Sequence, residues 1–392
     1  MSSVASSTTR RGVLPILDLA VWEKNPTVFA EQLRIACHRV GFFLLRHDMP
    51  QEVAQRQLDE TRRFFQQSTI EEKLSISYHN SPSFRGYMKL GVENTAGATD
   101  MREQIEYAAL YSPKDRTRMW PPYERLKHHQ NPWPHSHQPE LQTATEEYVG
   151  HARRISDVIR DALCMALGVH RDTLDPFFGR NCTQNGETDN AIEQEPPHWV
   201  LKLINYPVVQ TENKQDKSPK FGVGGHTDTN FLTLVLQDDV GGLQVFSEGD
   251  WIDVPSNLGP GVLVCNLGEQ AEILSGGYFL ATPHRVLANV GNKRDRVSVA
   301  LFYNPLLSAT IEPIVDPEQF HSPTNNNPDE TTATSALKWE RSDFEPWRRK
   351  SNAMLSTVGD NTFKSLARSH PEVFQKHHPD LKLLEDGSVV QG

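Results

Sequence analysis

Short apolar runs alternate with glycine, proline, asparagine and aspartate between residues 196 and 306. Runs of this length that are bounded by turn-forming residues are typical of β-strands. Their near-regular spacing predicts a β-sandwich or a jelly roll. The seven predicted strands lie within residues 199–207, 230–237, 242–246, 251–255, 261–267, 284–290 and 296–303.

Helical patterns surround this β-rich region. Residues 141–167 carry the longest one, which ends at Gly168, and we expect this helix to pack against the sheet. Residues 344–378 also have a helical pattern and are expected to cover the sandwich. The first 120 residues combine strands at 13–19 and 42–45 with helices that begin near Asn25 and Val53, followed by a capping box at Ser68-Thr69-Ile70-Glu71.

These patterns predict a mainly β protein with α additions. We divide the chain into a flexible N-terminus (1–12), an N-terminal module (13–120), a linker with the long helix (121–195), a jelly-roll core (196–306) and a C-terminal helical extension (307–392).

Composition narrows the function classes. The 392 residues include 40 Lys+Arg and 50 Asp+Glu, a net charge of −10, which lacks the basic surplus of a nucleic-acid binder. No apolar run approaches the roughly 18–20 residues of a membrane-spanning helix. The four cysteines (Cys37, Cys164, Cys182, Cys265) form no zinc-type pair and are expected to be buried thiols. We expect a monomeric, cytoplasmic protein with a small-molecule partner, a short organelle transit peptide being the alternative.

One group of residues suggests a metal site. His226 and Asp228 are two apart in an extended segment, so their side chains point the same way. His284 lies 56 residues after Asp228, and a jelly roll can bring the two strands together. Two imidazoles and one carboxylate leave open positions on a metal and suit non-haem Fe(II). The alternative is two surface histidines and a helix-capping aspartate.

A second group suggests an anion site. Arg296 and Ser298 share one strand face, and a guanidinium with a hydroxyl forms a carboxylate clamp. On the strand 199–207, Lys202 and Tyr206 also share a face. Exposed strand residues are the alternative for Arg296 and Lys202.

Taken together, these motifs resemble a known family. The order HTD, PHRV, RVSVALFYNP closely resembles the isopenicillin N synthase-like branch of the Fe(II)/2-oxoglutarate-dependent dioxygenases, as do LPILDLA, LRIACHRVGFFLLRHDMP, FFQQSTIEEK, NPWP and LINYP. The resemblance covers roughly residues 13–306. It implies a double-stranded β-helix (jelly roll) that uses Fe(II), 2-oxoglutarate and O₂.

The resemblance also implies residue roles. His226, Asp228 and His284 match the iron ligands, while Arg296 and Ser298 match the residues that hold the distal carboxylate of 2-oxoglutarate. Tyr206 matches a tyrosine near that co-substrate, although the strand lacks the family's second proline. Lys202 stands where some relatives place a basic residue that touches substrate or co-substrate.

Residues 83–107 have a finer resemblance, to the microbial ethylene-forming oxygenases. There a glutamate that matches Glu93 meets the cationic end of an amino-acid substrate. Lys202 would meet a carboxylate and Thr95 would add a hydroxyl contact, which together favour a zwitterionic, amino-acid-like substrate. The alternative is that Glu93 pairs with Arg85 or Arg102 and pins the loop.

Rival functions find less support. A zinc hydrolase would need HExxH or cysteine-rich ligands, and a nucleotide binder would need a P-loop or a strand–GxGxxG–helix motif. An inactive metal-binding module is the remote alternative. Within the family, some relatives use no 2-oxoglutarate. Hydroxylation is the default outcome, and desaturation, oxidative ring closure in secondary metabolism, or ethylene formation are alternatives at the same kind of iron site.

Overall fold

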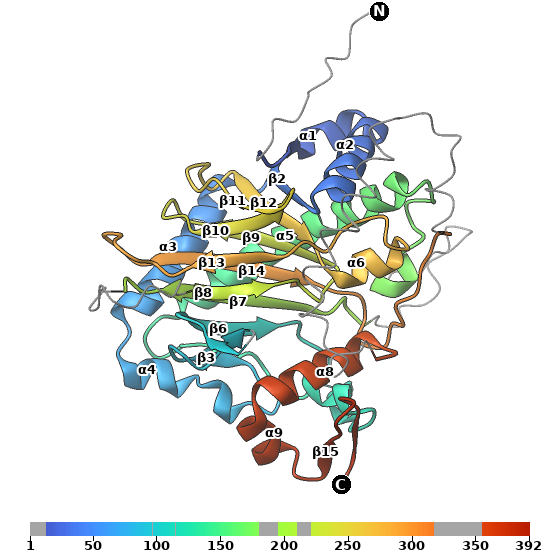
Figure 1. Cartoon of the computed structure of the whole chain (residues 1–392). Helices are drawn as coiled ribbons and strands as arrows, with labels where there is room; N and C mark the ends of the chain where they lie inside the picture. The colour runs from blue at the N-terminus through green and yellow to red at the C-terminus, as the bar shows by residue number, and fades with distance from the viewer. Residues whose placement is uncertain (1–12, 96, 114, 180–194, 210–220, 317–354) are drawn as a thin grey trace, which may run out of the picture.

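Two β-sheets packed face to face form the centre of the computed structural model (Figure 1). The structure describes residues 13–95, 97–113, 115–179, 195–209, 221–316 and 355–392. The larger sheet has eight strands and the smaller has four. The predicted flexible N-terminus (1–12) lies outside the described residues, as does much of the C-terminal extension.

The strands β7 to β14 make the jelly roll, four in each sheet. In the large sheet they are β12 (Val262–Leu267), β9 (Leu232–Gln237), β14 (Arg296–Tyr303) and β7 (Trp199–Tyr206). The small sheet has the order β11 (Asp250–Asp253), β10 (Leu243–Ser247), β13 (His284–Leu287), β8 (Phe221–His226). All seven predicted strands are present. Only β8 is additional, because its glycines lack the β-branched residues by which a strand is recognised.

The N-terminal region extends the large sheet at both edges. β1 (Ile16–Asp18) and β2 (Phe42–Arg46) follow β12, while β6 (Glu103–Ala108) and β3 (Gly86–Met88) follow β7. One sheet therefore runs through the predicted N-terminal module and the jelly roll. The five-part division of the chain stays a prediction.

Helices cover the outer face of the large sheet. α5 (Glu140–Ala166) and α3 (Gln51–Gln67) pack on β9 and β14, as predicted for the long helix, and α2 (Pro26–Arg39) packs on α5. Their apolar faces and the outward-facing strand residues form the larger core, whereas Ile204, Val223, Val245 and Val286 belong to a second core between the sheets. The patterns missed the short helices α1 (Leu19–Lys24) and α6 (Glu269–Leu274).

Local details add to this picture and correct one further expectation. The capping box before α4 (Ile70–Ser75) joins Thr69 and Glu72, one residue later than predicted. Residues 122–127, in the predicted linker, form the 3₁₀ turn η3 (Pro122–Lys127). The other 3₁₀ turns of the described residues are η1 (Tyr78–Asn80), η2 (Asp115–Thr117) and η4 (Asp175–Phe178).

The described part of the C-terminal region does not form one helix over the sandwich. It contains α8 (Val358–Ser369), α9 (Pro371–His377) and a hairpin of β15 (Leu381–Leu383) and β16 (Val389–Gln391). α8 packs on the 3₁₀ turn at Pro122–Lys127 and α9 on the one at Tyr78–Asn80, below β3 and β6 in Figure 1. Arg125 donates two hydrogen bonds to Asp380, at 2.8 and 2.6 Å, and Tyr78 donates one to Glu372 at 2.7 Å. The extension therefore fastens onto the N-terminal region, since its polar residues find their partners there.

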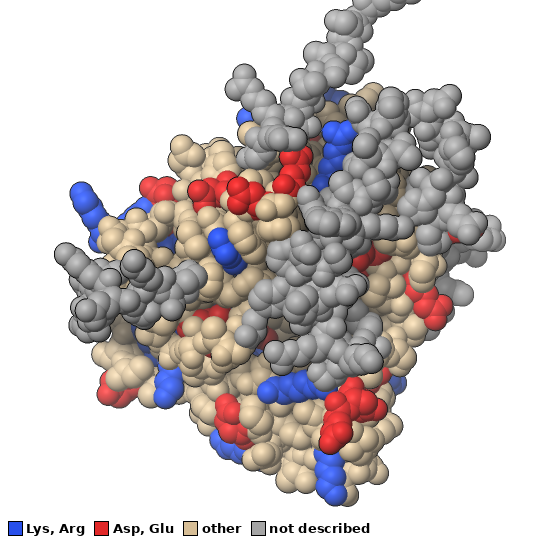
Figure 2. Space-filling model, in the orientation of Figure 1, with Lys and Arg blue, Asp and Glu red and all other residues tan. Residues whose placement is uncertain are grey.

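The surface and the thiols agree with the composition. Acidic and basic side chains are interspersed over the described part of the face in Figure 2. Cys37, Cys164 and Cys265 are buried free thiols, as predicted, and Cys182 lies outside the described residues. Within the described segments, no helix has the length and apolar character needed to cross a bilayer.

Gly41 offers a test of the packing between the helices and the sheet. Its φ is +69°, and an added Cβ would lie 2.3 Å from the carbonyl oxygen of Leu280. Gly41→Ala should therefore lower the free energy of unfolding by more than the roughly 1–2 kcal/mol of left-handed strain alone. Gly168→Ala is the matched control, because Gly168 has φ +74° and nothing within 4 Å of the added atom. Equal losses in urea denaturation would contradict the close contact.

Candidate active site

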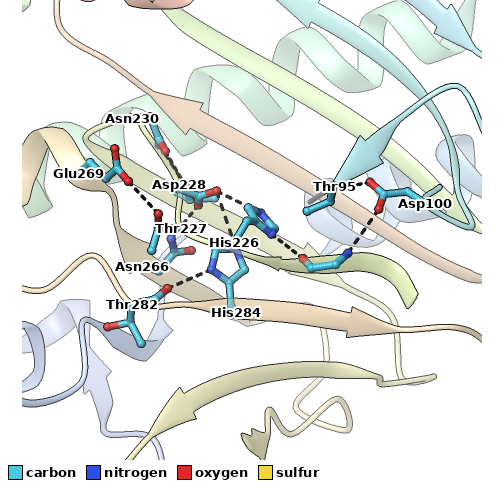
Figure 3. Close-up of polar contacts among 12 residues, drawn as sticks. Thr95, Asp100, His226, Thr227, Asp228, Asn230, Asn266, Glu269, Thr282 and His284 are labelled. Atoms are coloured by element: carbon cyan, nitrogen blue, oxygen red, sulfur yellow. Dashed lines mark hydrogen bonds and ion pairs between the residues drawn. The ribbon is translucent and has the colours of Figure 1, made fainter. Parts of the chain in front are cut away.

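The pairing of β8 with β13 places two histidines directly opposite each other. His284 is the register partner of His226, and their ring centroids are 4.3 Å apart. Asp228 follows β8 by two residues and turns back toward both rings (Figure 3). Its Oδ1 lies 3.7 Å from the Nε2 of each histidine. The structure thus brings together the three predicted metal ligands, with their ligand atoms within 4.8 Å of one another.

The other ring nitrogen of each histidine faces a backbone carbonyl. Nδ1 of His226 lies 2.9 Å from the oxygen of Gly224, and Nδ1 of His284 lies 3.2 Å from that of Thr282. A proton on Nδ1 satisfies these carbonyls and leaves the Nε2 lone pair for a metal. Each ring is therefore oriented by the residue two positions before it.

The large sheet orients the carboxylate of Asp228. Oδ2 accepts hydrogen bonds from Thr233 of β9 at 2.6 Å and from Asn266 of β12 at 2.7 Å. Both donors bind the same oxygen, so Oδ1 is the oxygen left to face the histidines.

Electrostatics favour the protonation states that a metal needs. Burial, together with the charge of His284, lowers the pKa of His226 to about 4. Burial acts to raise the pKa of Asp228, but the two histidines and the hydrogen bonds to Oδ2 outweigh it and hold the pKa below its usual value. At neutral pH the site offers a neutral imidazole at His226 and an ionised carboxylate. A facial set of two imidazoles and one carboxylate fits Fe(II).

A buried guanidinium lies on the central strand of the large sheet. Arg296 is 2% exposed, and it donates to Gln237 at 3.1 Å and to Ser298 at 3.4 Å. Its register partner Tyr206 lies under the guanidinium, 4.7 Å from ring centroid to Cζ. Among the described residues, no carboxylate lies within ion-pair distance of Arg296, and its Nε has no hydrogen-bond partner. A buried cation without a counter-ion fits an anionic ligand.

Strand β9 connects the two groups. Thr233, which holds Asp228, and Gln237, which holds Arg296, are four residues apart and therefore on the same face. Four residues of strand span about 13 Å. The guanidinium and the triad therefore lie on the same face of β9, separated by a short length of strand.

Glu93 lies in a cluster of charged side chains. Its carboxylate is 3.4 Å from Arg102 and 3.4 Å from His370, while its Oε1 accepts no hydrogen bond. Burial acts to raise the pKa of Glu93, but the positive charges of Lys202 and Arg102 outweigh it and lower the pKa. Of the two partners predicted for a loop-pinning role, only Arg102 contacts Glu93.

Arg85 has other partners. Its guanidinium donates to the backbone oxygens of Ala109, Leu126 and His129. The expected alternative pair of Glu93 with Arg85 is therefore wrong, because Arg85 serves carbonyl groups of the N-terminal region.

The remaining predicted substrate residues also have protein partners. Lys202 lies 3.4 Å from Glu106 on the neighbouring strand β6 and 5.6 Å from the ring centroid of Phe302. Thr95 donates to Asp100 at 2.8 Å. Glu93 and Lys202 share one charged cluster rather than forming two separate walls, and Thr95 lies at its margin.

Several residues of the site escaped the sequence analysis. Thr233 and Asn266 are polar positions inside apolar strands, and that contrast was the available clue. Gln237 ends its strand and resembles any exposed strand residue. His370 comes from the C-terminal extension, and nothing in the local pattern connects it with Glu93.

Two family models match the chain. The one described as the 2OG-Fe(II) oxygenase superfamily matches residues 199–305, from the start of β7 to just beyond β14. The one described as the non-haem dioxygenase in morphine synthesis N-terminal matches residues 14–136. The predicted resemblance to the Fe(II)/2-oxoglutarate-dependent dioxygenases is confirmed for the N-terminal part and for the jelly-roll core.

Curated proteins and solved structures agree. A homoarginine-6-hydroxylase of Glycine max is 35% identical over 72% of this chain and 80% of its own length. A 1-aminocyclopropane-1-carboxylate oxidase of Dictyostelium mucoroides is 26% identical over 94% of this chain and 98% of its own length. A full-length Neurospora crassa protein, solved in complex with alpha-KG, has a TM-score of 0.66 at 21% identity over 92% and 98% of the two chains. JOX2 in complex with 2OG, Fe and JA has a TM-score of 0.60 at 28% identity over 78% and 79%.

Removing the carboxylate of the triad tests the metal site. Asp228→Ala should raise the dissociation constant for cobalt(II), measured by titration calorimetry on the metal-free protein, by at least about 100-fold. Removing a residue that only orients a ligand already weakens metal binding by up to about that factor. Asp239→Ala is the control, because this neighbouring aspartate pairs with Arg294 on the surface. Unchanged affinity in Asp228→Ala would place the metal elsewhere.

Proposed function

Because this chain belongs to the 2OG-Fe(II) oxygenase superfamily, and is a dioxygenase that uses Fe(II), 2-oxoglutarate and O₂, we propose that it hydroxylates a small amino-acid-like molecule with a cationic group. The observation that carries the proposal is the pairing of the His226–Asp228–His284 triad with a charged cluster around Glu93. The triad supports the reaction, and the cluster supports the class of substrate.

Three residues would hold the iron. His226 and His284 would each bind through Nε2, because their Nδ1 atoms face carbonyl groups. Asp228 would bind through Oδ1, since Thr233 and Asn266 occupy Oδ2. Held in this way, the ligands would not need to reorganise when the metal arrives.

Arg296 would hold 2-oxoglutarate through its distal carboxylate. Ser298 would add a hydroxyl donor, and the Tyr206 ring would form the floor beneath the guanidinium. Gly222 of β8 leaves room for that ring, because a Cβ there would come within 2.6 Å of it. When bound, iron and 2-oxoglutarate would activate O₂, one oxygen atom going to succinate (released with CO₂) and the other to the substrate. The protein would supply the anchoring.

The carboxylate of Glu93 supports a cationic substrate. Glu93 shares Arg102 with Asp100, whereas Glu106 has Lys202 as its partner and also the charge of the buried Arg85. Burial lowers the pKa of His370, so this residue is neutral near pH 7. The Oε1 of Glu93 lies 3.4 Å from Nε2 of His370 and accepts no hydrogen bond, so it would accept one from a positive group. Glu93 would bind the cation and Lys202 the carboxylate, with Thr95 as a further contact.

The names of two relatives support an amino-acid substrate, because each of those proteins is named for an amino acid. One is a homoarginine-6-hydroxylase and another is a 1-aminocyclopropane-1-carboxylate oxidase. Homoarginine carries the guanidinium that Glu93 would bind.

We assign the enzyme to the cytoplasm, to the monomeric state and to secondary metabolism as parts of the same proposal. The buried free thiols support a reducing compartment.

A succinate-release screen tests the function. The panel contains L-homoarginine, L-arginine, L-lysine, 1-aminocyclopropane-1-carboxylate and thymine, the last as an uncharged control. We expect substrate-stimulated succinate release with one or more cationic amino acids. Stimulation by thymine alone would contradict the proposed substrate class while leaving the co-substrate intact.

Truncating Arg296 tests the 2-oxoglutarate clamp. Arg296→Ala should raise the Michaelis constant for 2-oxoglutarate about 30-fold or more, because a desolvated charge pair is worth at least about 2 kcal/mol when truncated. Arg296→Lys should restore only part, since lysine cannot form the bidentate fork. Arg294→Ala should have no effect, because Arg294 pairs with Asp239 on the surface. An unaffected Arg296→Ala enzyme would refute the clamp.

Glu93→Gln separates substrate binding from loop pinning. If Glu93 contacts the substrate, loss of its charge should raise the Michaelis constant for the amino acid by about tenfold or more. Iron and 2-oxoglutarate affinity should stay constant, and succinate release should become uncoupled from product. Glu103→Gln is the matched control, since Glu103 is similarly buried and pairs with Lys73 at 3.2 Å. A general loss of thermal stability and of all affinities would instead indicate a pin.

A further inference from the structure

Asp100 is a buried carboxylate that the proposed metal and co-substrate roles do not use. It is 1% exposed, and it accepts hydrogen bonds from the hydroxyl of Thr95 at 2.8 Å and from the backbone N–H of Gly224 at 3.3 Å. Arg102 lies 3.2 Å from its Oδ2. A buried charge is costly unless several partners stabilise it, so this arrangement holds its neighbours in one geometry.

Gly224 connects Asp100 with an iron ligand. The N–H of Gly224 binds Asp100, and its C=O faces Nδ1 of His226 at 2.9 Å. Figure 3 shows the two contacts as consecutive dashed lines that join Asp100 to the triad. The link reaches the side of His226 that sets the ring orientation.

Gly224 allows a close contact with Thr95. A Cβ there would lie 3.2 Å from the side chain of Thr95, tighter than an ordinary packing distance. The short strand β4 (Asn94–Thr95), which pairs with β5 (Ala98–Thr99), lies on β8.

Asp100 is also tied to Glu93. Its backbone N–H donates to the carbonyl oxygen of Glu93 at 3.0 Å. One nitrogen of Arg102, Nη2, lies 3.4 Å from the Glu93 carboxylate and 3.2 Å from that of Asp100. A cation that binds Glu93 competes with Arg102 for that carboxylate, so how strongly Arg102 pairs with Asp100 depends on what Glu93 binds.

We propose that Asp100 is a positioning residue that couples the Glu93 segment to the iron ligand His226 through Gly224. The proposal rests on the metal role of His226 stated above. When a substrate cation occupies Glu93, Arg102 pairs with Asp100 alone, and Asp100 holds Gly224 and the His226 ring more firmly. By linkage, metal binding strengthens substrate binding by the same factor.

Hydrogen–deuterium exchange on the full-length protein, with cobalt(II) as the probe, tests the coupling without a substrate. In the wild type, cobalt(II) should slow exchange at residues 222–226 and 284–287. It should also slow exchange at residues 93–95 and 98–100, by about fivefold or more. Asp100→Asn should keep the first effect and lose the second. Thr95→Val, which removes one hydroxyl but keeps the shape, should reduce the second effect and decides the question if Asp100→Asn does not fold.

A second readout separates positioning from stability. Asp100→Asn should raise the cobalt(II) dissociation constant about tenfold and shift the visible absorption bands of bound cobalt(II), because the His226 ring is less firmly held. Asp161→Asn is the matched control, since it weakens another buried pair, with Arg160 at 2.6 Å. Asp161→Asn should lower the stability of the fold without changing the cobalt(II) dissociation constant or the absorption bands.

The outcomes distinguish the two proposals. Protection of β8 and β13 without protection of residues 93–95 and 98–100 in the wild type would refute the coupling and leave the metal site standing. Equal protection of those residues in wild type and Asp100→Asn would also refute it. Protection of neither region would refute the metal site, and the coupling with it.

Discussion

The register between β8 and β13 is the constraint on which the site depends. His226 and His284 are cross-strand partners, and the side-chain period of a strand is two residues. A slip of one residue would turn one imidazole to the opposite face of the small sheet and destroy the triad. Val223 and Val286 pair in the same ladder and both belong to the core between the sheets. A register shift lies between this pair and the histidine pair, so the irregularity of the ladder, together with apolar packing, sets where the two imidazoles meet.

The third ligand depends on how the two sheets face each other. Asp228 leaves the small sheet, yet its carboxylate is held by Thr233 and Asn266 of the large one. The turn that follows is close-packed: a Cβ at Gly268 would lie 2.1 Å from the carbonyl oxygen of Asn230 and 2.9 Å from that of Asp228. Sheet spacing, more than any local preference, sets the distance between carboxylate and imidazoles.

Local pattern and long-range contact explain what the sequence could predict. The spacing of His226 and Asp228, the apolar strands and the face shared by Arg296 and Ser298 are local, and each was predicted from residues two apart or from short runs. β8 was missed because Gly222, Gly224 and Gly225 carry no strand preference of their own. The packing of the Tyr206 ring requires glycine at position 222, and Thr95 packs closely on Gly224. The sequence could not decide whether Arg85 or Arg102 pairs with Glu93, because that choice depends on the three-dimensional course of the backbone. In the structure Arg85 instead donates to the backbone oxygen of Ala109. His370 follows Glu93 by 277 positions, a separation over which no periodic pattern carries information.

The charged cluster around Glu93 is better explained by function than by stability. Desolvation of buried ions offsets most of their mutual attraction, so well-packed apolar residues of similar volume often stabilise a fold equally well. The cluster nevertheless keeps Glu93, Arg102 and Lys202 in a region where the sheet core could have been extended, and it draws His370 from the far end of the chain to join them. In an ion pair, unlike an apolar contact, an external group can take the place of an internal group of the same charge with little loss of free energy. A site that must exchange an internal cation for an external one requires such pairs, and Glu93, which shares Arg102 with Asp100, is the carboxylate of the cluster best placed for the exchange.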